Sequence, residues 1–205
     1  MKMAWVLGWA VPESWFEPLA RAAFPGATHI CVRPGPAALA DLTGRGPFDW
    51  IAGYSLGSLL LLLDPARAQS LGRVALLAPV FGFPSELGLG GRIRRVQVSL
   101  TARRLRFDAP GALAQFRALA GLEVADQAGE PDRLEDLLWG LERLEHDQVP
   151  PRLPAGWLAW CGEWDALLDA ARLRELVPEV AVVPGATHHP ASLLRAFAER
   201  TASSP

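Results

Sequence analysis

The sequence predicts an α/β fold built on a doubly wound, mainly parallel sheet of six strands. Short and nearly continuous apolar runs recur along the chain, as expected for strands that are covered on both faces. Helix-like segments alternate with these runs, and this alternation is typical of right-handed crossovers between parallel strands. The alternation breaks between residues 83 and 154, which predicts an inserted helical cap.

Turn residues bound each of the six apolar runs. The predicted strands are Ala4–Leu7, Thr28–Val32, Asp49–Ala52, Arg73–Ala78, Gly156–Cys161 and Val180–Val183. The predicted helices between and after them are Glu13–Phe24, Ala37–Leu42, Leu56–Leu63, Leu167–Leu176 and Pro190–Arg200. In a sheet of this kind, ligands bind at the carboxyl ends of the strands.

The break in the alternation contains two predicted amphipathic helices. Ala109–Gly121 carries apolar residues at helical spacing, and so does Asp132–His146, which Pro131 and acidic residues open. The alternative is an ordinary crossover helix with a long loop. We expect a core of residues 1–82 and 155–205, with a cap of residues 83–154.

Composition indicates one folded domain, because half of the 205 residues are hydrophobic and only 20% are charged. No apolar run reaches the roughly 18–20 residues that span a bilayer, and the first apolar run is expected to be a strand rather than a signal peptide. Cys31 and Cys161 suit buried thiols in a reduced cytoplasm, so we expect a cytoplasmic protein. Metal-ligand spacings are absent, and neither a metal nor a cofactor is expected.

Residues 53–57 (Gly-Tyr-Ser-Leu-Gly) form a G-x-S-x-G motif with Ser55 at its centre. Alone, this motif is often an ordinary turn. Here an apolar strand precedes it and a leucine-rich helix follows it, which favours a nucleophile elbow. The tight turn needs glycine at both flanks, and it aims the backbone N–H of Leu56 at a developing oxyanion.

A nucleophilic serine needs a base, and the chain has four histidines. His29 is expected to be structural, and His146 is expected to face water at the end of a cap helix. His188 and His189 follow the last predicted strand, in a loop at the carboxyl edge of the sheet. One of these two is therefore expected to be the general base.

The acid that orients the base is expected in another loop at the same edge. Asp165 follows the fifth predicted strand, whereas Glu163 and Asp169 are poorer candidates. Asp165 could also cap a helix beginning near Ala166, and the two roles are compatible. A second oxyanion donor is expected from the backbone N–H of Trp9 in the turn after the first strand, where Gly8 permits the turn.

Four segments together resemble the α/β-hydrolase superfamily over nearly the whole chain. They are Val6-Leu7-Gly8-Trp9, Gly53-Tyr54-Ser55-Leu56-Gly57, Gly162-Glu163-Trp164-Asp165 and Ala186-Thr187-His188-His189-Pro190. The serine, acid, histidine order also matches that superfamily. Within it the chain is most similar to carboxylesterases that cleave pimeloyl-acyl-carrier-protein methyl ester in biotin synthesis, which share a segment like Phe116-Arg117-Ala118-Leu119.

This resemblance implies a serine carboxylesterase with a catalytic set of Ser55, Asp165 and His188. It implies an α/β-hydrolase fold that lacks the first two strands and carries a helical cap. Two departures concern Leu7, where many members have histidine, and Ser58, where a second glycine is usual. The rival activities are a general short-chain esterase, a thioesterase, and a catalytically silent protein that binds ligands with the same fold.

Six arginines lie between Gly91 and Phe107 with no acidic residue among them. They are Arg92, Arg94, Arg95, Arg103, Arg104 and Arg106. The run is either a solvated face or a landing patch for an acidic partner such as acyl carrier protein. The formal net charge of −2 and the lack of a reading motif disfavour nucleic acid, and no membrane partner is expected. Trp9, Leu56 and Phe116 are expected to line the acyl channel.

Overall fold

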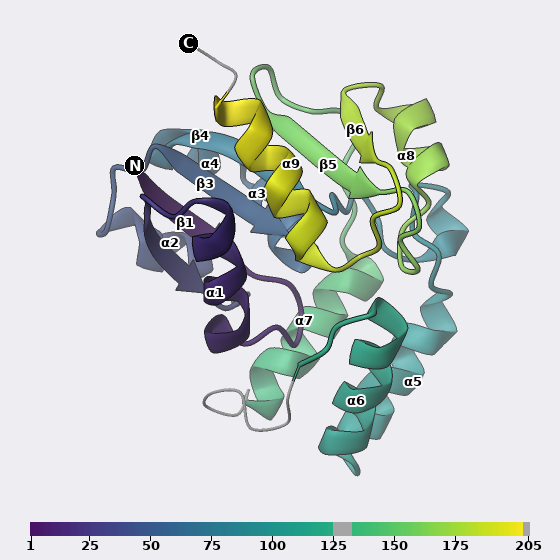
Figure 1. Ribbon diagram of the computed structural model, residues 1–205. Helices are drawn as coiled ribbons and strands as arrows, with labels where there is room; N and C mark the ends of the chain where they lie inside the picture. The colour runs from purple at the N-terminus through teal and green to yellow at the C-terminus, as the bar shows by residue number, and fades with distance from the viewer. Residues whose placement is uncertain (125–132, 203–205) are drawn as a thin grey trace.

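A computed structural model describes residues 1–124 and 133–202. Its centre is a sheet of six parallel strands in the order β2-β1-β3-β4-β5-β6 (Figure 1). The strands are β1 (Lys2–Val6), β2 (Thr28–Val32), β3 (Trp50–Tyr54), β4 (Arg73–Leu77), β5 (Leu158–Gly162) and β6 (Val180–Val183). Each lies within two residues of its predicted bounds, so the six-stranded parallel sheet is confirmed.

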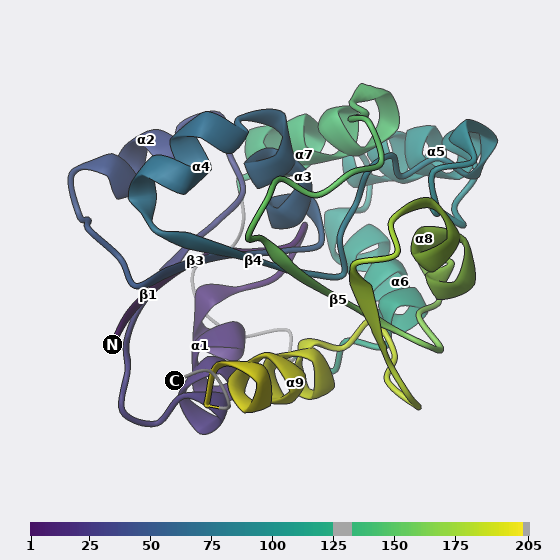
Figure 2. The same ribbon diagram turned by 90° about the horizontal axis from the view of Figure 1, so that it is seen from above.

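Helices cover both faces of the sheet (Figure 2). α1 (Glu13–Ala23) and α9 (Pro190–Ala202) lie together on one face, while α2 (Ala38–Thr43), α3 (Leu56–Leu63) and α4 (Pro65–Leu71) lie on the other. This double cover explains why the strands are apolar almost throughout. α8 (Ala170–Leu176) packs beside β6.

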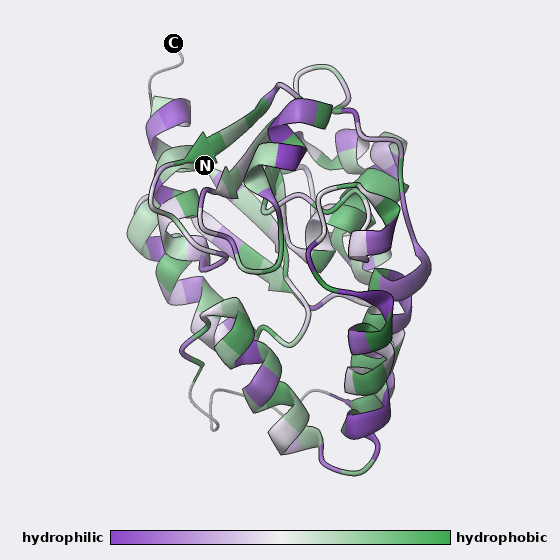
Figure 3. Cartoon of the chain, turned by 90° about the vertical axis from the view of Figure 1, so that its right-hand side faces the viewer, coloured by the Kyte–Doolittle hydropathy of each residue, from purple (hydrophilic) through white to green (hydrophobic). Residues whose placement is uncertain are grey.

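A helical insert joins β4 to β5 and lies beyond the carboxyl ends of the strands (Figure 1). It holds the short 3-10 helix η1 (Ser85–Leu87) and the helices α5 (Arg95–Leu105), α6 (Ala109–Ala120) and α7 (Leu134–His146). α5 packs against both α6 and α7. Figure 3 shows hydrophobic and hydrophilic residues interleaved along these helices. The insert confirms the predicted helical cap. Its bounds, residues 83–154, remain a prediction.

Two helices differ from the expectation. α5 was not predicted, because Val96, Val98 and Leu100 alternate with polar residues in its first half, and only Val98 and Leu105 are buried on it. α4 was not predicted either, although Asp64 and Pro65 form a helix-start signal in which the Asp64 carboxylate accepts the Arg67 backbone N–H. Pro131 and Asp132, which were expected to open α7, lie outside the described residues.

The described helices include none that is both long enough and apolar enough to cross a membrane. Cys31 and Cys161 are free thiols, and burial raises the pKa of both.

Candidate active site

Ser55 lies in the sharp turn between β3 and α3, with backbone angles φ 53° and ψ −115°. A positive φ is uncommon for a residue with a side chain, and such strained residues cluster at active sites. A Cβ added at Gly57 would lie 1.9 Å from the carbonyl oxygen of Val6, and one at Gly53 would lie 2.6 Å from that of Gly57. The turn therefore requires small residues on both sides of Ser55, as the sequence predicts.

Three predicted site residues meet above this turn, in one hydrogen-bonded chain. Ser55 Oγ lies 3.1 Å from Nε2 of His188, and Nδ1 of His188 lies 2.7 Å from Oδ2 of Asp165. All three side chains are buried. An ionised carboxylate only accepts, so Nδ1 of His188 carries the ring proton and Nε2 accepts from the Ser55 hydroxyl. This geometry allows His188 to remove the Ser55 proton when the hydroxyl attacks.

The carboxylate of Asp165 uses its two oxygens for different purposes. Oδ1 accepts the backbone N–H groups of Leu167 at 2.8 Å and Leu168 at 3.0 Å, while Oδ2 holds His188. The two roles expected for this residue thus coexist. Because residues 166–168 fold around this carboxylate, α8 begins at Ala170 rather than at 167, and Asp169 caps it.

The two alternative acids contact other groups. Glu163 accepts the backbone N–H of Gly185 at 2.8 Å, and Asp169 accepts that of Arg172 at 3.0 Å. Asp165 is therefore the acid that the fold brings to His188.

The neighbouring histidine, His189, turns to a different part of the molecule. Its ring packs edge-on against Trp15 at 5.2 Å, and its Nδ1 accepts the backbone N–H of Ala191 at 3.2 Å. Burial lowers the pKa of the His189 ring. His188, not His189, thus makes the hydrogen bond to Ser55.

The other two histidines lie where the sequence predicts. In β2, His29 accepts the indole N–H of Trp5 on Nδ1 and donates from Nε2 to the carbonyl of Phe24. Burial lowers the pKa of this ring, which keeps it neutral and structural. His146 is exposed at the end of α7.

The turn after β1 lies directly over the elbow. A Cβ added at Gly8 would lie 3.1 Å from the Tyr54 ring and 3.3 Å from Ser55 Cβ. Trp9 follows Gly8, and both Trp9 and Leu56 are buried. Across residues 1–124 and 133–202, no protein group accepts the backbone N–H of Trp9 or Leu56. These two donors are available next to Ser55, and their role as oxyanion donors stays a prediction.

Tyr54 supports His188 in a way that the sequence analysis missed. Its hydroxyl donates to the carbonyl oxygen of His188 at 2.8 Å, and the two rings lie 5.4 Å apart. Burial, reinforced by the negative charge of Asp165, raises the pKa of this hydroxyl well above its ordinary value. The hydroxyl therefore keeps its proton. The acceptor is a main-chain carbonyl 134 residues away in sequence, so the sequence does not reveal this hydrogen bond. The only sequence signal for Tyr54 is its place in the G-x-S-x-G motif.

Ser58 stands where many α/β-hydrolases have a second glycine, and its side chain stabilises the turn that carries Ser55. Its hydroxyl lies 2.6 Å from the carbonyl of Ser55 and donates to it, and it accepts the backbone N–H of Val80 at 2.9 Å. A glycine at position 58 would make neither contact.

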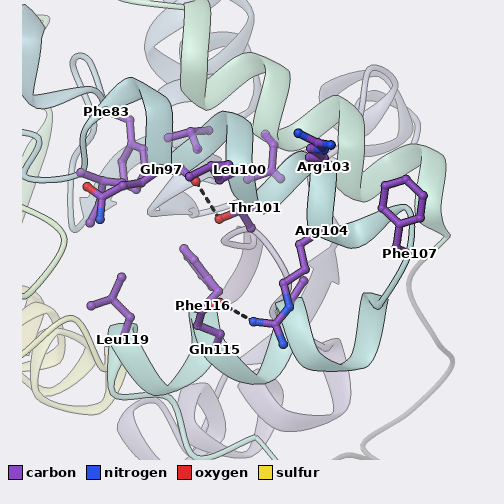
Figure 4. A pocket seen from close by; sticks show the side chains of 14 residues that line it. Phe83, Gln97, Leu100, Thr101, Arg103, Arg104, Phe107, Gln115, Phe116 and Leu119 are labelled. Carbon is purple, nitrogen blue, oxygen red and sulfur yellow. Dashed lines mark hydrogen bonds between the residues drawn. The ribbon is translucent and has the colours of Figure 1, made fainter.

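A cavity of about 640 Å³ lies in the cap, between α5 and α6 (Figure 4). Its lining is mostly apolar: Phe83, Ile93, Gln97, Val98, Leu100, Thr101, Arg103, Arg104, Phe107, Ala112, Gln115, Phe116, Leu119 and Leu141. Phe116 lines it, whereas Trp9 and Leu56, the other two residues expected in the acyl channel, do not. The ring of Phe116 packs edge-on against that of Trp9 at 4.6 Å. The cavity therefore ends one side chain away from Trp9.

The six arginines of the expected patch are spread along α5 and the segment before it. Arg94 and Arg95 start α5, while Arg103, Arg104 and Arg106 end it. The guanidinium of Arg104 is bound to Asp108 at 2.9 Å and to Gln115 at 2.7 Å. Arg92 lies before the helix, 3.9 Å from Asp169. Asp108, which directly follows the run, and Asp169, which is remote in sequence, thus bring negative charge to two of the six arginines.

Within the part of the chain that the structure describes, no group of three histidine, cysteine or carboxylate side chains could hold a metal ion.

No known protein family matches the chain, and no curated protein is similar to it in sequence. Solved structures are similar in fold. An esterase from Exiguobacterium antarcticum superposes with a TM-score of 0.76 at 15% identity, over 99% of this chain and 91% of that one. A thioesterase of the prodiginine pathway in Streptomyces coelicolor gives 0.63 at 15% identity, over 100% and 90%.

A probable hydrolytic enzyme from Pseudomonas aeruginosa gives a TM-score of 0.59 at 19% identity, over 98% of this chain and 83% of that one. Identities this low establish the fold and nothing beyond it. The chain therefore has the α/β-hydrolase fold, with a six-stranded all-parallel sheet and the helical insert α5–α7.

Proposed function

We propose that this protein is a cofactor-free serine hydrolase that cleaves acyl esters. The observation that supports this most directly is the buried hydrogen-bonded chain from Asp165 through His188 to Ser55. A structural serine would not need the strained backbone of position 55, nor a buried histidine held by a buried carboxylate. The solved structures of similar fold include an esterase and a thioesterase.

In this proposal, Ser55 Oγ attacks the ester carbonyl while Nε2 of His188 takes its proton. Asp165 keeps the other ring proton on Nδ1 and stabilises the imidazolium that forms. The alcohol leaves with the proton from His188, and Ser55 is left acylated. A water molecule then attacks the acyl group, His188 takes the water's proton, and the acid departs as Ser55 recovers its hydrogen.

The tetrahedral oxyanion lies between the backbone N–H groups of Trp9 and Leu56. Both come from turns beside Ser55, and neither donates to another group of the described chain. One such donor contributes roughly 3 kcal/mol of transition-state stabilisation.

The acyl group belongs in the cap cavity, whose mainly apolar lining includes Phe83, Val98 and Phe116. The finer proposal is pimeloyl-[acyl-carrier protein] methyl ester, which rests on the sequence resemblance. Arg103 at the cavity suits the phosphopantetheine phosphate of such a substrate (Figure 4), whereas Arg104 is already paired with Asp108. A general short-chain esterase and a thioesterase are the rivals, since the same three catalytic side chains serve all of them.

Hydrolysis of p-nitrophenyl acetate and butyrate tests the activity. We expect wild-type turnover, and a loss of about a thousandfold or more in Ser55→Ala. Ser70→Ala is the matched control, because Ser70 is exposed on α4 and distant in sequence from the elbow. Turnover that survives Ser55→Ala would remove the proposed nucleophile.

The substrate is tested with methyl esters of a dicarboxylic acyl chain, free and attached to acyl carrier protein. A strong preference for the carrier-bound ester, together with rescue of growth without biotin in a strain lacking its own esterase, supports the finer proposal. Efficient cleavage of p-nitrophenyl acetate with no cleavage of the carrier-bound ester supports the general esterase. Preference for a carrier-bound thioester supports the thioesterase.

A further inference from the structure

The turn after β1 is bound to the cap at three points. The indole N–H of Trp9 donates to the carbonyl of Leu137 in α7 at 2.8 Å, and this contact is buried. The Trp9 ring also meets Phe116 of α6 edge-on, with centroids 4.6 Å apart. Arg117, the next residue of α6, donates from two guanidinium nitrogens to the carbonyl of Ala10, at 3.1 and 3.3 Å.

The turn has little hydrogen bonding of its own. The N–H of Leu7 donates to Val32 at 3.0 Å, and that of Val11 donates to Gly8 at 3.4 Å, which is long for such a bond. Ala10 has a positive φ of 58°, which is unfavourable for a residue with a side chain. The contacts from the cap therefore contribute much of what keeps the main chain of Trp9 in place.

Gly140 in α7 explains how the indole comes so close. A Cβ at this position would lie 2.6 Å from Cδ1 of Trp9 and 3.0 Å from Cδ2 of Leu56. Glycine in the middle of a helix is about 1 kcal/mol less favourable than alanine, so helix formation alone does not account for it. One point on α7 thus touches both residues whose backbone N–H groups are the proposed oxyanion donors.

We propose that α7 positions the oxyanion donors, with Gly140 and the Leu137 carbonyl forming a seat for the Trp9 indole. This inference rests on the proposed function. The cap then acts on the chemical step as well as on substrate binding, because Trp9 presents its N–H correctly only while its indole occupies the seat. Gly140 and Leu137 are positioning residues in this arrangement, and neither touches the reacting atoms.

Gly140→Ala tests the seat. The added methyl group suits a helix but collides with the indole. We expect kcat for a p-nitrophenyl ester to fall by about tenfold to a hundredfold, with KM within about twofold of the wild-type value, because one donor is worth about 10² to 10³ in kcat. Trp9→Phe removes the indole N–H and adds no atoms, and it is expected to lower kcat in the same manner.

A trifluoromethyl ketone inhibitor separates positioning from general damage. It adds to the serine and forms an oxyanion like that of the transition state, so its Ki reports the donors directly. We expect Ki to rise in both variants by the same factor as kcat/KM falls. Trp15→Phe is the matched control: it also removes an indole hydrogen bond to a carbonyl, that of Glu123 at 3.0 Å, but this indole lies on α1 and its ring packs against His189, away from Leu137 and Gly140. Its kcat and Ki are expected to stay within about twofold of wild type.

Two results would overturn the seat. One is wild-type kcat and Ki in a folded Gly140→Ala protein. The other is a Ki that stays constant while kcat/KM falls in Trp9→Phe, which remains informative where the extra methyl prevents folding. The proposed function fails separately. If the wild-type protein lacks Ser55-dependent hydrolysis, both proposals fall; if it hydrolyses esters and the variants match it, only the seat falls.

Discussion

At the scale of single residues, the proposed chemistry depends on His188 being held at both its ring and its backbone. Asp165 orients His188 at Nδ1, and the hydroxyl of Tyr54 holds its backbone carbonyl. The meeting of Ser55, Asp165 and His188 was predictable, because each follows a recognisable strand at the carboxyl edge of the sheet. Tyr54 and Ser58 were not, since they bind main-chain carbonyls whose positions no sequence pattern reveals.

Replacing each of the two adjacent histidines tests the assignment of the base. His188→Ala is expected to lower kcat by about a thousandfold or more, because Ser55 then has no proton acceptor. His189→Ala is expected to lower kcat by less than about tenfold, since its Nδ1 only accepts from Ala191. Steady-state kinetics at saturating p-nitrophenyl butyrate measures both, and equal losses would contradict the assignment.

Tyr54→Phe removes the hydroxyl that holds the loop of His188. Loss of one buried hydrogen bond is expected to lower the free energy of unfolding by about 1–3 kcal/mol, because the His188 carbonyl loses its partner. A fall in kcat with an unchanged KM is expected as well. Urea unfolding and steady-state kinetics check this, and unchanged stability would show that the hydroxyl does not support the loop.

At the scale of elements, a helix was predictable where its apolar residues recur at helical spacing along the sequence. α6 and α7 show apolar residues at helical spacing, and their existence was predicted. α5 packs against α6 and α7, but Val96, Val98 and Leu100 alternate with polar residues, so its sequence gives no comparable pattern. The same limit applies to the arginine run, because its sequence does not reveal that Asp169 lies 3.9 Å from Arg92.

The elbow itself gives the sharpest test at this scale. Gly57→Ala would place a methyl carbon 1.9 Å from the carbonyl of Val6, so β1 or α3 must move. We expect a loss of more than about 3 kcal/mol in the free energy of unfolding, or failure to fold. Gly44→Ala is the control, because Gly44 has a φ of −80° and nothing near its missing Cβ. Its stability is expected to stay the same or to rise by up to about 1 kcal/mol.

At the scale of the whole molecule, the fold was predictable because strands covered on both faces appear in the sequence as short, nearly continuous apolar runs. The docking of the cap was not, because it depends on side chains that meet across the molecule. Trp9 illustrates the contrast. Its place in the turn after β1 was predictable from the sequence, whereas the hydrogen bond from its indole to the Leu137 carbonyl was not. The cavity likewise lies inside the cap rather than around Trp9 and Leu56.

Three groups, the thiols of Cys31 and Cys161 and the hydroxyl of Tyr54, make the free energy of unfolding fall at alkaline pH. Burial raises the pKa of Cys31 to about 12 and raises the pKa values of Cys161 and Tyr54 as well. As pH rises above the ordinary pKa of each group, the unfolded chain loses the proton while the folded chain keeps it. The free energy of unfolding therefore falls, by up to about 1.4 kcal/mol per pH unit for each group.

Urea unfolding at pH 7.5, 9 and 10 measures this loss. Stability is expected to fall across the series, and Cys31→Ala is expected to fall less steeply than wild type because one of the three groups is gone. A stability that stays level from pH 7.5 to pH 10 would contradict the burial of these groups.

The central claim is that Ser55 is an activated nucleophile, and labelling with a fluorophosphonate followed by mass spectrometry tests it most directly. The folded wild-type protein is expected to take up one label, on the peptide that contains Ser55, while His188→Ala is labelled far more slowly and Ser55→Ala not at all. A folded wild-type protein that takes no label, or one whose label persists in Ser55→Ala, would contradict the claim and favour a silent ligand-binding protein.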